Sequence, residues 1–455
     1  MTMTALYPPR VTPSSRPLPL LPFLGRFVRN PLRAVPLSVY HEPVVIYGKK
    51  RPLIVWVTDP TLVENILLKN AEQFPKTRLD RRVLKPIIGN GLLTAQGENW
   101  RWQRKIASPP FRHTELLTYV PAMLEAANNC VTDWKSRGAK PFVTNIEEDM
   151  TEATFAIIAR TILAGVSKAD GEIIKRAGRA YLDPISWEVA AALLQVPEKM
   201  WHPGKSRMRR AAIELRAMVQ GLVAQRRQEG AIGNDLVARM LAAKDPDTGE
   251  PMSDEVIADN LATFLFAGHE TTAKTLTWTL YLLARAPEWQ ERLREELHTA
   301  IGNDPIDGGT ITKLPTMSRV LKESMRLYPP APVMTRVNAE DVEIGGNQIP
   351  SPTLVVIPIF AIHRHRSLWQ DPDRFDPDRF LPENEAQYPR TQFMPFGYGQ
   401  RVCIGSSFAI LEATAILATL LRSVRFEWDG RHAPEPVSRV TLRPKGGMPL
   451  IVRPL

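Results

Sequence analysis

The feature of this 455-residue sequence that most constrains its fold is one long segment with helical periodicity, residues 254–286. Ser253 is suited to cap the start of a helix, and Asp254 and Glu255 place negative charge where the helix dipole favours it. At the rise of an α-helix, such a segment would be roughly 50 Å long. A helix of that length would cross most of a protein of this size.

The rest of the sequence predicts a mainly α-helical protein with small β-sheets. The 41 prolines far exceed the average share of about 5% and favour fixed connections between helices. From their periodicity we expect further helices over residues 62–68, 100–107, 114–136, 146–163, 207–229, 288–301, 317–327 and 407–421. We expect strands over residues 44–47 and 53–57, with a turn at 48–51 between them, and over 354–357, 437–442 and 450–452.

Composition and charge exclude several classes of protein. A hydrophobic content of 44% is ordinary for a globular protein and excludes a disordered or fibrous chain. The net charge is +10, but acidic residues are interspersed with the basic ones, and no run alternates basic with aromatic residues. This pattern argues against nucleic acid as a partner. Two cysteines cannot build a disulfide framework, so we expect a cytoplasmic protein.

The first 40 residues form a proline-rich segment. Its apolar stretch, residues 18–24, is interrupted by Pro19 and Pro22 and lacks the layout of a signal peptide. A membrane span needs about 20 apolar residues, and no window of the chain provides them without charges or prolines. We therefore expect a soluble protein, in which residues 1–40 are an N-terminal strap and residues 41–455 a single domain.

The strongest motif lies in residues 393–405, FMPFGYGQRVCIG, which contain the pattern F-x-x-G-x-R-x-C-x-G. Cys403 stands just before a predicted helix, whose free N–H groups favour a thiolate. One thiolate with no second cysteine nearby fits a single axial bond to iron better than zinc, which takes about four ligands. For Cys130, within a helical run, a buried and inert thiol is expected.

The middle of the long helix reads LATFLFAGHETTAKTL and contains unexpected polar residues. Ala267 and Gly268 weaken the helix locally, and the hydroxyl of Thr271 can bond back to the carbonyl of Ala267. The adjacent acid and alcohol, Glu270 and Thr271, are costly in an apolar helix unless they serve a function. The alternative is a polar stripe on a half-exposed helix.

Two more patterns each place two side chains on one helical face. Glu323 and Arg326 are three residues apart before a Tyr-Pro-Pro sequence that ends their helix, and the later segment FDPDRF supplies Arg379. Trp100 and Arg104 are four residues apart, so an indole N–H and a guanidinium could both donate to a carboxylate. Each pattern alone also occurs on ordinary amphipathic helices.

The four motifs, in the order in which they occur along the chain, resemble those of the cytochrome P-450 superfamily of haem-thiolate monooxygenases. The resemblance is to the soluble bacterial type. The resemblance covers nearly the whole chain and implies the cytochrome P-450 fold, with haem b between the long helix and the helix after the cysteine loop. It implies that Cys403 binds the haem iron as axial thiolate, that Phe396 lies near the sulfur, and that Arg401 pairs with a propionate. Glu270 and Thr271 would be catalytic and relay protons toward dioxygen.

The resemblance also assigns roles to the other two motifs. Trp100 and Arg104 would bind the haem propionates, and Arg336 and His363 occupy places where some members do the same. Glu323, Arg326 and Arg379 would form a buried network that fixes the geometry around the cysteine loop rather than adding stability, because burying charges is expensive.

The function implied is the insertion of one oxygen atom from O2 into an apolar small molecule. Phe264 and Ala267 on the long helix would contact the substrate, together with a loop at residues 81–93 and the segments 187–203 and 332–335. His269 would line the same groove.

Electrons would come from separate proteins, because the sequence contains no glycine-rich nucleotide motif and no cysteine cluster. A ferredoxin with its reductase, or an equivalent pair, would suit the basic surface at Arg101, Lys105 and Arg112.

Two alternatives remain open on the sequence. A haem-thiolate isomerase or a peroxide-using relative would share the cysteine loop but need no redox partner, and the presence of both Glu270 and Thr271 argues against it. A haem-based gas or redox sensor would lack the acid–alcohol pair and would carry an output domain. Neither prediction holds for this sequence.

Overall fold

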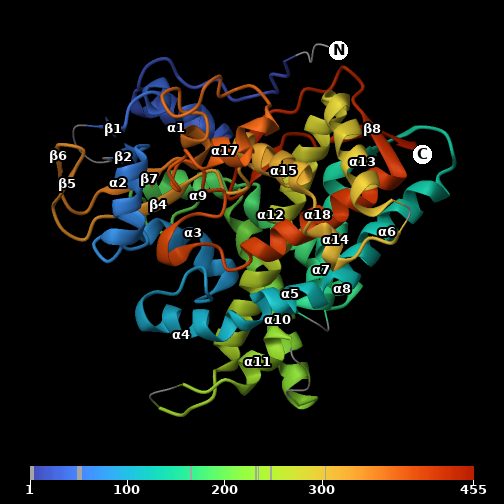
Figure 1. Ribbon diagram of the computed structural model, residues 1–455. Coiled ribbons are helices and arrows are strands. Elements are labelled where there is room, and N and C mark those ends of the chain that lie inside the picture. Colours follow the sequence, from blue (N-terminus) through green and yellow to red (C-terminus); the bar gives the residue numbers. More distant parts are fainter. Residues whose placement is uncertain are drawn as a thin grey trace.

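Helix α12 (Asp254–Arg285) crosses the protein from side to side (Figure 1). The chain is described here by a computed structural model that covers residues 5–48, 54–163, 166–230, 233, 235–245, 248–302 and 304–455. Residues 257–265 and 272–283 of α12 are buried, which makes this helix the centre of the core. The side chain of Ser253 accepts a hydrogen bond from the N–H of Val256, as its predicted capping role requires. The predicted long helix is confirmed.

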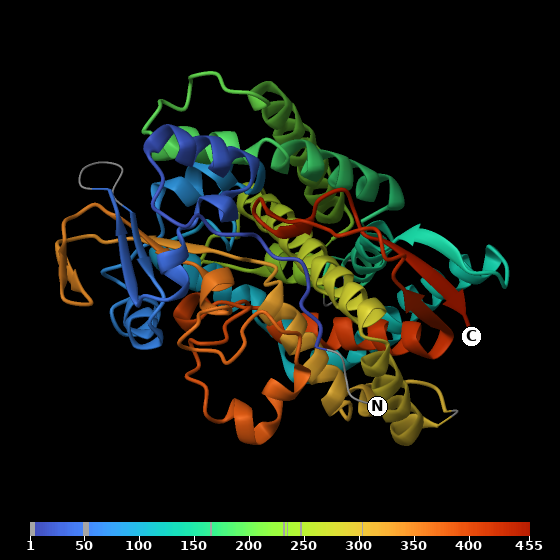
Figure 2. The same cartoon turned by 90° about the horizontal axis from the view of Figure 1, so that it is seen from above.

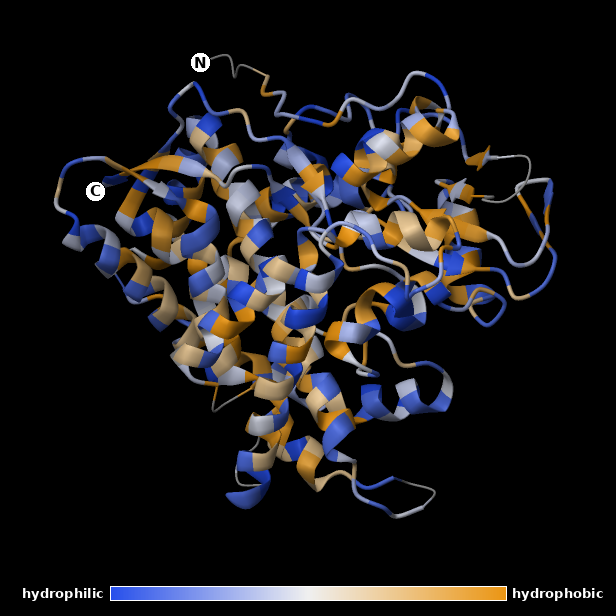
Figure 3. Ribbon diagram, turned by 180° about the vertical axis from the view of Figure 1, so that it is seen from behind, coloured by the Kyte–Doolittle hydropathy of each residue, from blue (hydrophilic) through white to orange (hydrophobic). Residues whose placement is uncertain are grey.

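Four helices pack along α12 and enclose it (Figure 2). They are α7 (Ile146–Thr161), α10 (Lys205–Gln228), α15 (Pro315–Leu327) and α18 (Ser406–Ser423). Hydrophobic and hydrophilic segments alternate along the helices in Figure 3, as expected when one face of a helix meets the core. By length and composition, α18 is the one helix in the described ranges that could cross a membrane, but 61% of its most apolar window is buried inside the protein. Its apolar character is explained by its place in the core.

The remaining helices cover this centre and the sheets. They are α1 (Leu20–Arg29), α2 (Pro60–Glu64), α3 (Arg78–Ile88), α4 (Gly97–Ala107), α5 (His113–Thr118), α6 (Val120–Ser136), α8 (Lys168–Leu182), α9 (Ile185–Leu193), α11 (Leu236–Ala242), α13 (Pro287–Ile301), α14 (Gly308–Ile311), α16 (Ile359–Ile362) and α17 (Pro382–Glu385). A π-helical turn, Asn65–Lys69, continues α2.

A four-stranded sheet forms a second centre of packing on one side of the molecule (Figure 1). Its strands are β1 (Val44–Tyr47), β2 (Ile54–Val57), β7 (Leu354–Ile357) and β4 (Met334–Val337), in this spatial order. The two inner strands are parallel, and most of their residues are buried, which explains their continuous apolar sequences. Residues 49–51 of the predicted turn between β1 and β2 lie outside the described residues.

Three smaller sheets complete the fold. Strands β3 (Phe142–Asn145), β11 (Pro449–Pro454) and β8 (Val424–Glu427) pair in that order, and β5 (Val342–Ile344) pairs with β6 (Asn347–Ile349). The predicted single strand at 437–442 is wrong. Two strands, β9 (Pro436–Ser438) and β10 (Leu442–Pro444), form a hairpin there, because the N–H of Arg439 bonds to the carbonyl of Thr441 and turns the chain.

Several helix boundaries also differ from the sequence prediction. The helix expected over 114–136 is two helices, α5 and α6, since Pro121 cannot donate a hydrogen bond to the preceding turn. Most of the loop expected over 81–93 is helical, because Thr77 and Asp80 form a capping box that starts α3. Despite its prolines, the N-terminal segment contains α1.

Candidate active site

The cysteine loop, residues 396–405, leads directly into the N-terminus of α18. Gly397 and Gly399 have φ angles of 73° and 77°, which favour glycine over any other residue. A Cβ atom at position 399 would lie 2.0 Å from the carbonyl oxygen of Leu67, so the loop packs directly on the backbone of the π-helical turn. The N–H of Cys403 donates to the carbonyl of Phe396 at 2.9 Å and closes the loop. These constraints fix the direction of the cysteine.

The side chain of Cys403 is exposed to solvent. Desolvation by the surrounding loop raises the pKa of its thiol, whereas the N–H of Gly405 and the positive charge of Arg104 act to lower it. Cys130 on α6 lies in a different environment, where burial and the charges of Asp149 and Asp133 raise the pKa of its thiol. Of the two cysteines, only Cys403 combines an accessible sulfur with a nearby cation.

A cluster of cations lies beside the cysteine loop. The guanidinium of Arg401 stacks over the ring of Trp100 at 4.0 Å and donates to the carbonyl of Ala95 at 2.9 Å. Burial lowers the pKa of Arg401 to about 10, and the charges of Arg336 and Arg104 add to this effect. The three predicted arginines are therefore close enough to repel one another.

Lys76 is a fourth cation of this cluster, and no sequence motif marked it. Burial lowers the pKa of its ammonium to about 8, the charges of Arg401 and Arg336 contribute in the same direction, and Asp80 opposes them. Its ammonium donates to the carbonyl of Leu93. In the sequence, Lys76 is distinguished only by its position one residue before the capping box of α3. That position points to the cation cluster only once the fold is known.

The acid–base network predicted from the sequence is present, with Glu323 and Arg326 fully buried and Arg379 half-buried at its edge. Arg326 donates to both carboxylate oxygens of Glu323, at 2.7 and 2.8 Å, and its other N–H groups reach the backbone carbonyls of residues 363, 372 and 374. The guanidinium of Arg379 lies 3.6 Å from the same carboxylate and donates to the carbonyls of residues 370 and 371. The network thus holds the irregular stretch of chain between residues 363 and 376 against α15.

His363 lies in this network rather than in the cation cluster. Its Nε2 accepts a hydrogen bond from the N–H of Met394 at 3.0 Å, and its ring tilts against Phe393. Burial, together with the charges of Arg326 and Arg364, lowers the pKa of His363 to about 3, so the ring is neutral. These contacts give no support to the expectation that His363 binds a propionate.

One short face of α12 is open although the rest of the helix is buried. Ala267 is exposed and Gly268 and Thr271 are half-buried, all within one turn. The hydroxyl of Thr271 donates to the carbonyl of Ala267 at 2.9 Å, as the sequence predicts. One turn earlier, Phe264 stacks on Phe111 at 5.8 Å, and Phe111 packs beside residue 405 of the cysteine loop. The open face of α12 and the cysteine loop are therefore joined by an aromatic contact.

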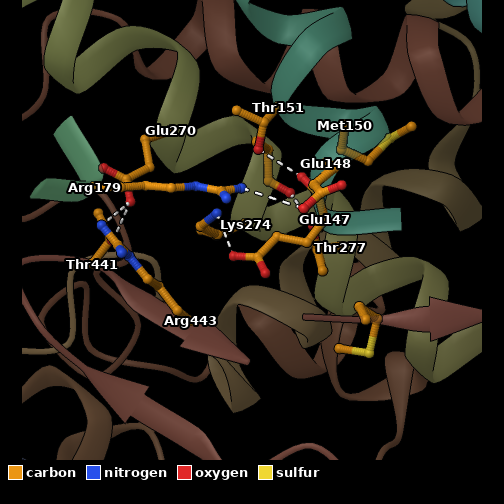
Figure 4. Close-up of polar contacts among 12 residues, drawn as sticks. Glu147, Glu148, Met150, Thr151, Arg179, Glu270, Lys274, Thr277, Thr441 and Arg443 are labelled. Atoms are coloured by element: carbon orange, nitrogen blue, oxygen red, sulfur yellow. Dashed lines mark hydrogen bonds and ion pairs between the residues drawn. The ribbon is translucent and has the colours of Figure 1, made fainter. Parts of the chain in front are cut away.

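Glu270 turns away from this open face toward the hairpin of β9 and β10 (Figure 4). Its carboxylate accepts a hydrogen bond from Thr441 at 2.9 Å and forms an ion pair with Arg443 at 2.8 Å. Burial alone would raise the pKa of this carboxyl, but Arg443, Lys274 and His269 together with the Thr441 hydrogen bond hold it below its ordinary value. Glu270 is therefore ionised at neutral pH.

A polar cavity of about 1120 Å³ lies on the far side of Glu270 and also borders α7, α8 and α10. Lys274, one turn further along α12, pairs at 2.7 Å with Glu147, which also lines the cavity (Figure 4). His269 borders the same cavity, bonds to the carbonyl of Leu265 and lies edge-on to Phe155. It does not share the open face with Thr271, so the expectation that it lines that groove is wrong.

Comparison with known proteins identifies the family. A family model described as cytochrome P450 matches residues 17–451. The chain belongs to the cytochrome P450 family. It is 32% identical to a cytokinin hydroxylase of Arabidopsis thaliana over 90% of this chain and 82% of that protein. It is 31% identical to cyclooctat-9-en-7-ol 5-monooxygenase of Streptomyces melanosporofaciens over 89% of this chain and 86% of that one.

Solved structures agree with this P450 assignment. The crystal structure of the cytochrome P450DA heme domain is 26% identical, with a TM-score of 0.76, and the alignment covers 98% of this chain and 97% of that chain. The heme domain of a P450DA mutant has a TM-score of 0.79 at 25% identity, covering 99% of this chain and 98% of that chain. The predicted cytochrome P-450 fold is confirmed, and the protein is a P450 monooxygenase with haem held by a cysteine thiolate.

The residues of this P450 fit a haem. The accessible sulfur of Cys403 is a suitable axial donor to iron. Arg401 is repelled by Arg336 and Arg104, and Lys76 by Arg401 and Arg336; the two carboxylates of a haem would relieve that repulsion. The donor chemistry therefore matches both the metal and the acidic edge of the cofactor.

Proposed function

We propose that Cys403 is the axial ligand of haem b in this P450, with Phe396 beside the sulfur. Arg401, Arg104, Arg336 and Trp100 hold the propionates, and Lys76, which the sequence did not mark, joins them. The observation that carries this proposal is the convergence of one accessible thiol and a group of cations around the cysteine loop, in which Arg401 is repelled by Arg336 and Arg104, and Lys76 by Arg401 and Arg336. Residues 41–455 form the haem-thiolate domain, and residues 1–40 are its N-terminal strap.

The test is the substitution Cys403→Ala. Without the sulfur, the ferrous protein loses the carbon monoxide spectrum that marks thiolate ligation, because no other donor of that kind is available. Cys130→Ala is the matched control and leaves this spectrum unchanged. A thiolate-type spectrum in Cys403→Ala would contradict the assignment.

The proposed reaction inserts one oxygen atom of O2 into an apolar small molecule and reduces the other to water. Bound haem supplies the activation of dioxygen. Thr271 holds its hydroxyl at the open face of α12, anchored to the Ala267 carbonyl. Glu270 stands between that face and the polar cavity, where it can take up protons from solvent and release them to Thr271 by a change of rotamer. Arg443 keeps the carboxylate ionised and positioned until then.

The substrate would meet the open face of α12 near Ala267 and Phe264. Phe264 supports this face through its contact with Phe111, and Ala267 is the residue of α12 that is exposed in mid-helix. Substrate contacts are also proposed in segments 81–93, 187–203 and 332–335. Of these, residues 90 and 92 bond through their N–H groups to Asp259 and Asn260 of α12, which places that connection beside the same helix.

Electron delivery is proposed from a separate ferredoxin and its reductase in the cytoplasm. Arg101 and Lys105 are exposed on α4 and flank Arg104, whose charge acts on Cys403, and Arg112 is exposed just after α4. An acidic donor docked there would lie close to the cysteine. Neutralising Arg101 and Lys105 together should slow reduction at low salt and flatten its salt dependence, as stopped-flow measurement would report. Unchanged rates at low salt would contradict this docking face.

A further inference from the structure

The polar cavity beside Glu270 has two sides of different character. On one side, α7 and α8 supply acidic residues, most of which pair with a nearby cation, as Glu147 does with Lys274 at 2.7 Å (Figure 4). The other side is basic, and its cations come from the end of α1, the turn after it, the start of α10 and the hairpin of β9 and β10. We call these cations the hairpin wall: Arg29, Arg33, Arg207, Arg439, Arg443 and Lys445.

The hairpin wall carries more positive charge than the neighbouring carboxylates neutralise. Among the described residues that line this side of the cavity, the acids are Asp183, Glu270 and Glu435. Two of these acids are each shared by two cations. The pairs are Arg33 and Lys445 with Glu435, at 2.7 and 3.7 Å, and Arg207 and Arg443 with Asp183, at 3.2 and 3.7 Å. The wall therefore keeps an excess of positive charge that faces the cavity.

Arg439 is held in place without a counter-ion. Within the described part of the chain it forms no ion pair, and its guanidinium donates at 3.0 Å to the buried hydroxyl of Ser186 and at 3.3 Å to the carbonyl of Arg29. Burial lowers the pKa of Arg439, and the charge of Arg443 contributes in the same direction, whereas Asp183 opposes them. A cation that is bound by neutral groups beside a second cation is stabilised by any anion that reaches both.

The hairpin brings Arg439 and Arg443 to the same cavity and links them to Glu270. The N–H of Arg439 bonds to the carbonyl of Thr441 and turns the chain, so that Arg443 on β10 lies opposite Val437 on β9. The guanidinium of Arg443 also forms the 2.8 Å ion pair with Glu270. A guanidinium has a limited set of N–H donors in a fixed geometry. An anion that binds Arg443 from the cavity therefore competes with Glu270 for those donors.

We propose that the hairpin wall is a binding site for a small multivalent oxyanion of the phosphate class, held between Arg439 and Arg443, and that the bound anion loosens the hold of Arg443 on Glu270. A cavity of about 1120 Å³ admits a small molecule, and the charge of the wall attracts anions and repels metal cations. The binding site depends only on this charge and geometry. Its effect as a regulator, which frees the Glu270 carboxylate to move, rests on the proposed proton relay.

The test is calorimetric titration of the haem-loaded protein with inorganic pyrophosphate at low salt. The wild type should bind one pyrophosphate. Arg439→Gln should bind it about tenfold more weakly, because a charge-assisted contact is lost. Glu270→Gln should bind it about tenfold more tightly, because Arg443 no longer shares its donors with a carboxylate and the competition between two ligands of one group is reciprocal.

Arg453→Gln and Glu427→Gln are the matched controls, because these two residues pair with each other away from the cavity and their substitution changes the net charge by the same amounts. Both should bind pyrophosphate like the wild type. Haem absorption establishes that each variant is folded, and Glu270→Gln decides alone if Arg439→Gln loses haem.

Equal affinity of the wild type and the wall variant, or no binding of pyrophosphate, would overturn the site. Several weak binding events that shift equally in the wall variant and the controls would indicate an adventitious ion only and would overturn it as well. Tighter binding in Glu270→Gln with intact coupling of electrons to product would keep the anion site and remove the proton relay. Unchanged affinity in Glu270→Gln with impaired coupling would keep the relay and overturn its regulation through Arg443.

Discussion

Two buried carboxylate–guanidinium pairs in this P450 differ in their surroundings. All five N–H groups of Arg326 donate to Glu323 or to backbone carbonyls, and both side chains are fully buried. Glu270 and Arg443 form an equally short pair, but both line a cavity of about 1120 Å³. The first pair is sealed, whereas the second is in contact with a polar space that can supply protons.

This difference separates a structural role from a chemical one. A saturated ion pair without access to water cannot change its protonation state at low cost, so it can only hold geometry. A carboxylate held by one arginine beside a polar cavity can be protonated and released, which is what a proton relay needs. The comparison therefore supports a structural role for the Glu323 network, which holds the chain at residues 363–376, and the proposed role of Glu270 in proton transfer.

A third buried carboxyl, Glu412 on α18, extends the comparison. Neither of its oxygens has a hydrogen-bond partner by strict geometry among the described residues, although the nearby hydroxyl of Thr272 acts to stabilise its anion. Burial raises the pKa of Glu412 to about 8, so the carboxyl is largely neutral at pH 7. The core thus contains three kinds of carboxyl group. Glu323 is sealed from solvent and paired with arginines, Glu270 is paired with an arginine beside a cavity, and Glu412 is sealed from solvent without a paired cation.

The largest effect is expected from Glu323→Gln. Removing the negative charge leaves Arg326 buried without its counter-ion, which costs about 3–5 kcal/mol of unfolding free energy. Haem retention should fall as well, because the segment at residues 372–376 loses its anchor. Chemical denaturation followed by circular dichroism measures the first effect and haem absorbance the second.

Glu427→Gln provides the control for this substitution, since Glu427 pairs with Arg453 near the surface at 2.8 Å. An exposed pair of this kind contributes at most about 1 kcal/mol. A loss for Glu323→Gln no larger than for Glu427→Gln would remove the distinction between the sealed network and an ordinary surface pair.

Glu270→Gln should leave haem binding intact but impair catalysis. Without a carboxylate to carry protons from the cavity, turnover should fall roughly 100-fold, the lower end of the effect of a general acid–base group. Electrons should then appear as hydrogen peroxide rather than product, and Thr271→Ala should show the same leak. Product and peroxide formed per NADPH measure this coupling.

Glu172→Gln is the control for the relay, because Glu172 lines the same cavity but its side chain is 62% exposed at the rim. Its coupling should equal that of the wild type. Intact coupling in Glu270→Gln would show that protons reach the open face of α12 by another path, and the contrast with the sealed pair would lose its functional meaning.

Glu412→Gln should produce the smallest change, and in the opposite direction. The folded pKa of about 8 lies above the ordinary value of 4.5, so the stabilising contribution of this carboxyl is complete below pH 4.5 and is lost as pH rises through 8. Glutamine does not ionise, so the stability of the variant relative to the wild type should rise between pH 5 and pH 8. Unfolding free energies measured at pH 5 and pH 8 test this. A wild type whose stability relative to the variant does not fall over this range would contradict a neutral Glu412.

Much of the fold could be predicted because its signals are local. The boundaries of α12 were recovered to within one residue at each end, and Thr271 bonds back to Ala267 as a four-residue spacing requires. The E-x-x-R pair also forms as predicted, since both residues share a helix face. Boundaries failed where a proline or a capping box decided them, as at Pro121 and Thr77.

The candidate site was harder to predict wherever a partner comes from a distant segment. Nothing in the motif around Glu270 indicates that Thr441 and Arg443 will bind it, because the hairpin that carries them was read as one strand. His363 was placed with the propionates by resemblance, whereas its carbonyl accepts from Arg326 and its ring accepts from the N–H of Met394. Lys76 carries no motif at all.

The sequence by itself determined the long central helix and the reactive loop, because each depends on spacing within one continuous segment. It also indicated the family, because four such local motifs follow one another in a characteristic order. Only the tertiary structure decided which carboxylates are sealed and which is open, and where the fourth cation lies. The physical reason is that burial and pairing depend on what packs around a side chain, and in this protein those neighbours are often more than a hundred residues away in the chain.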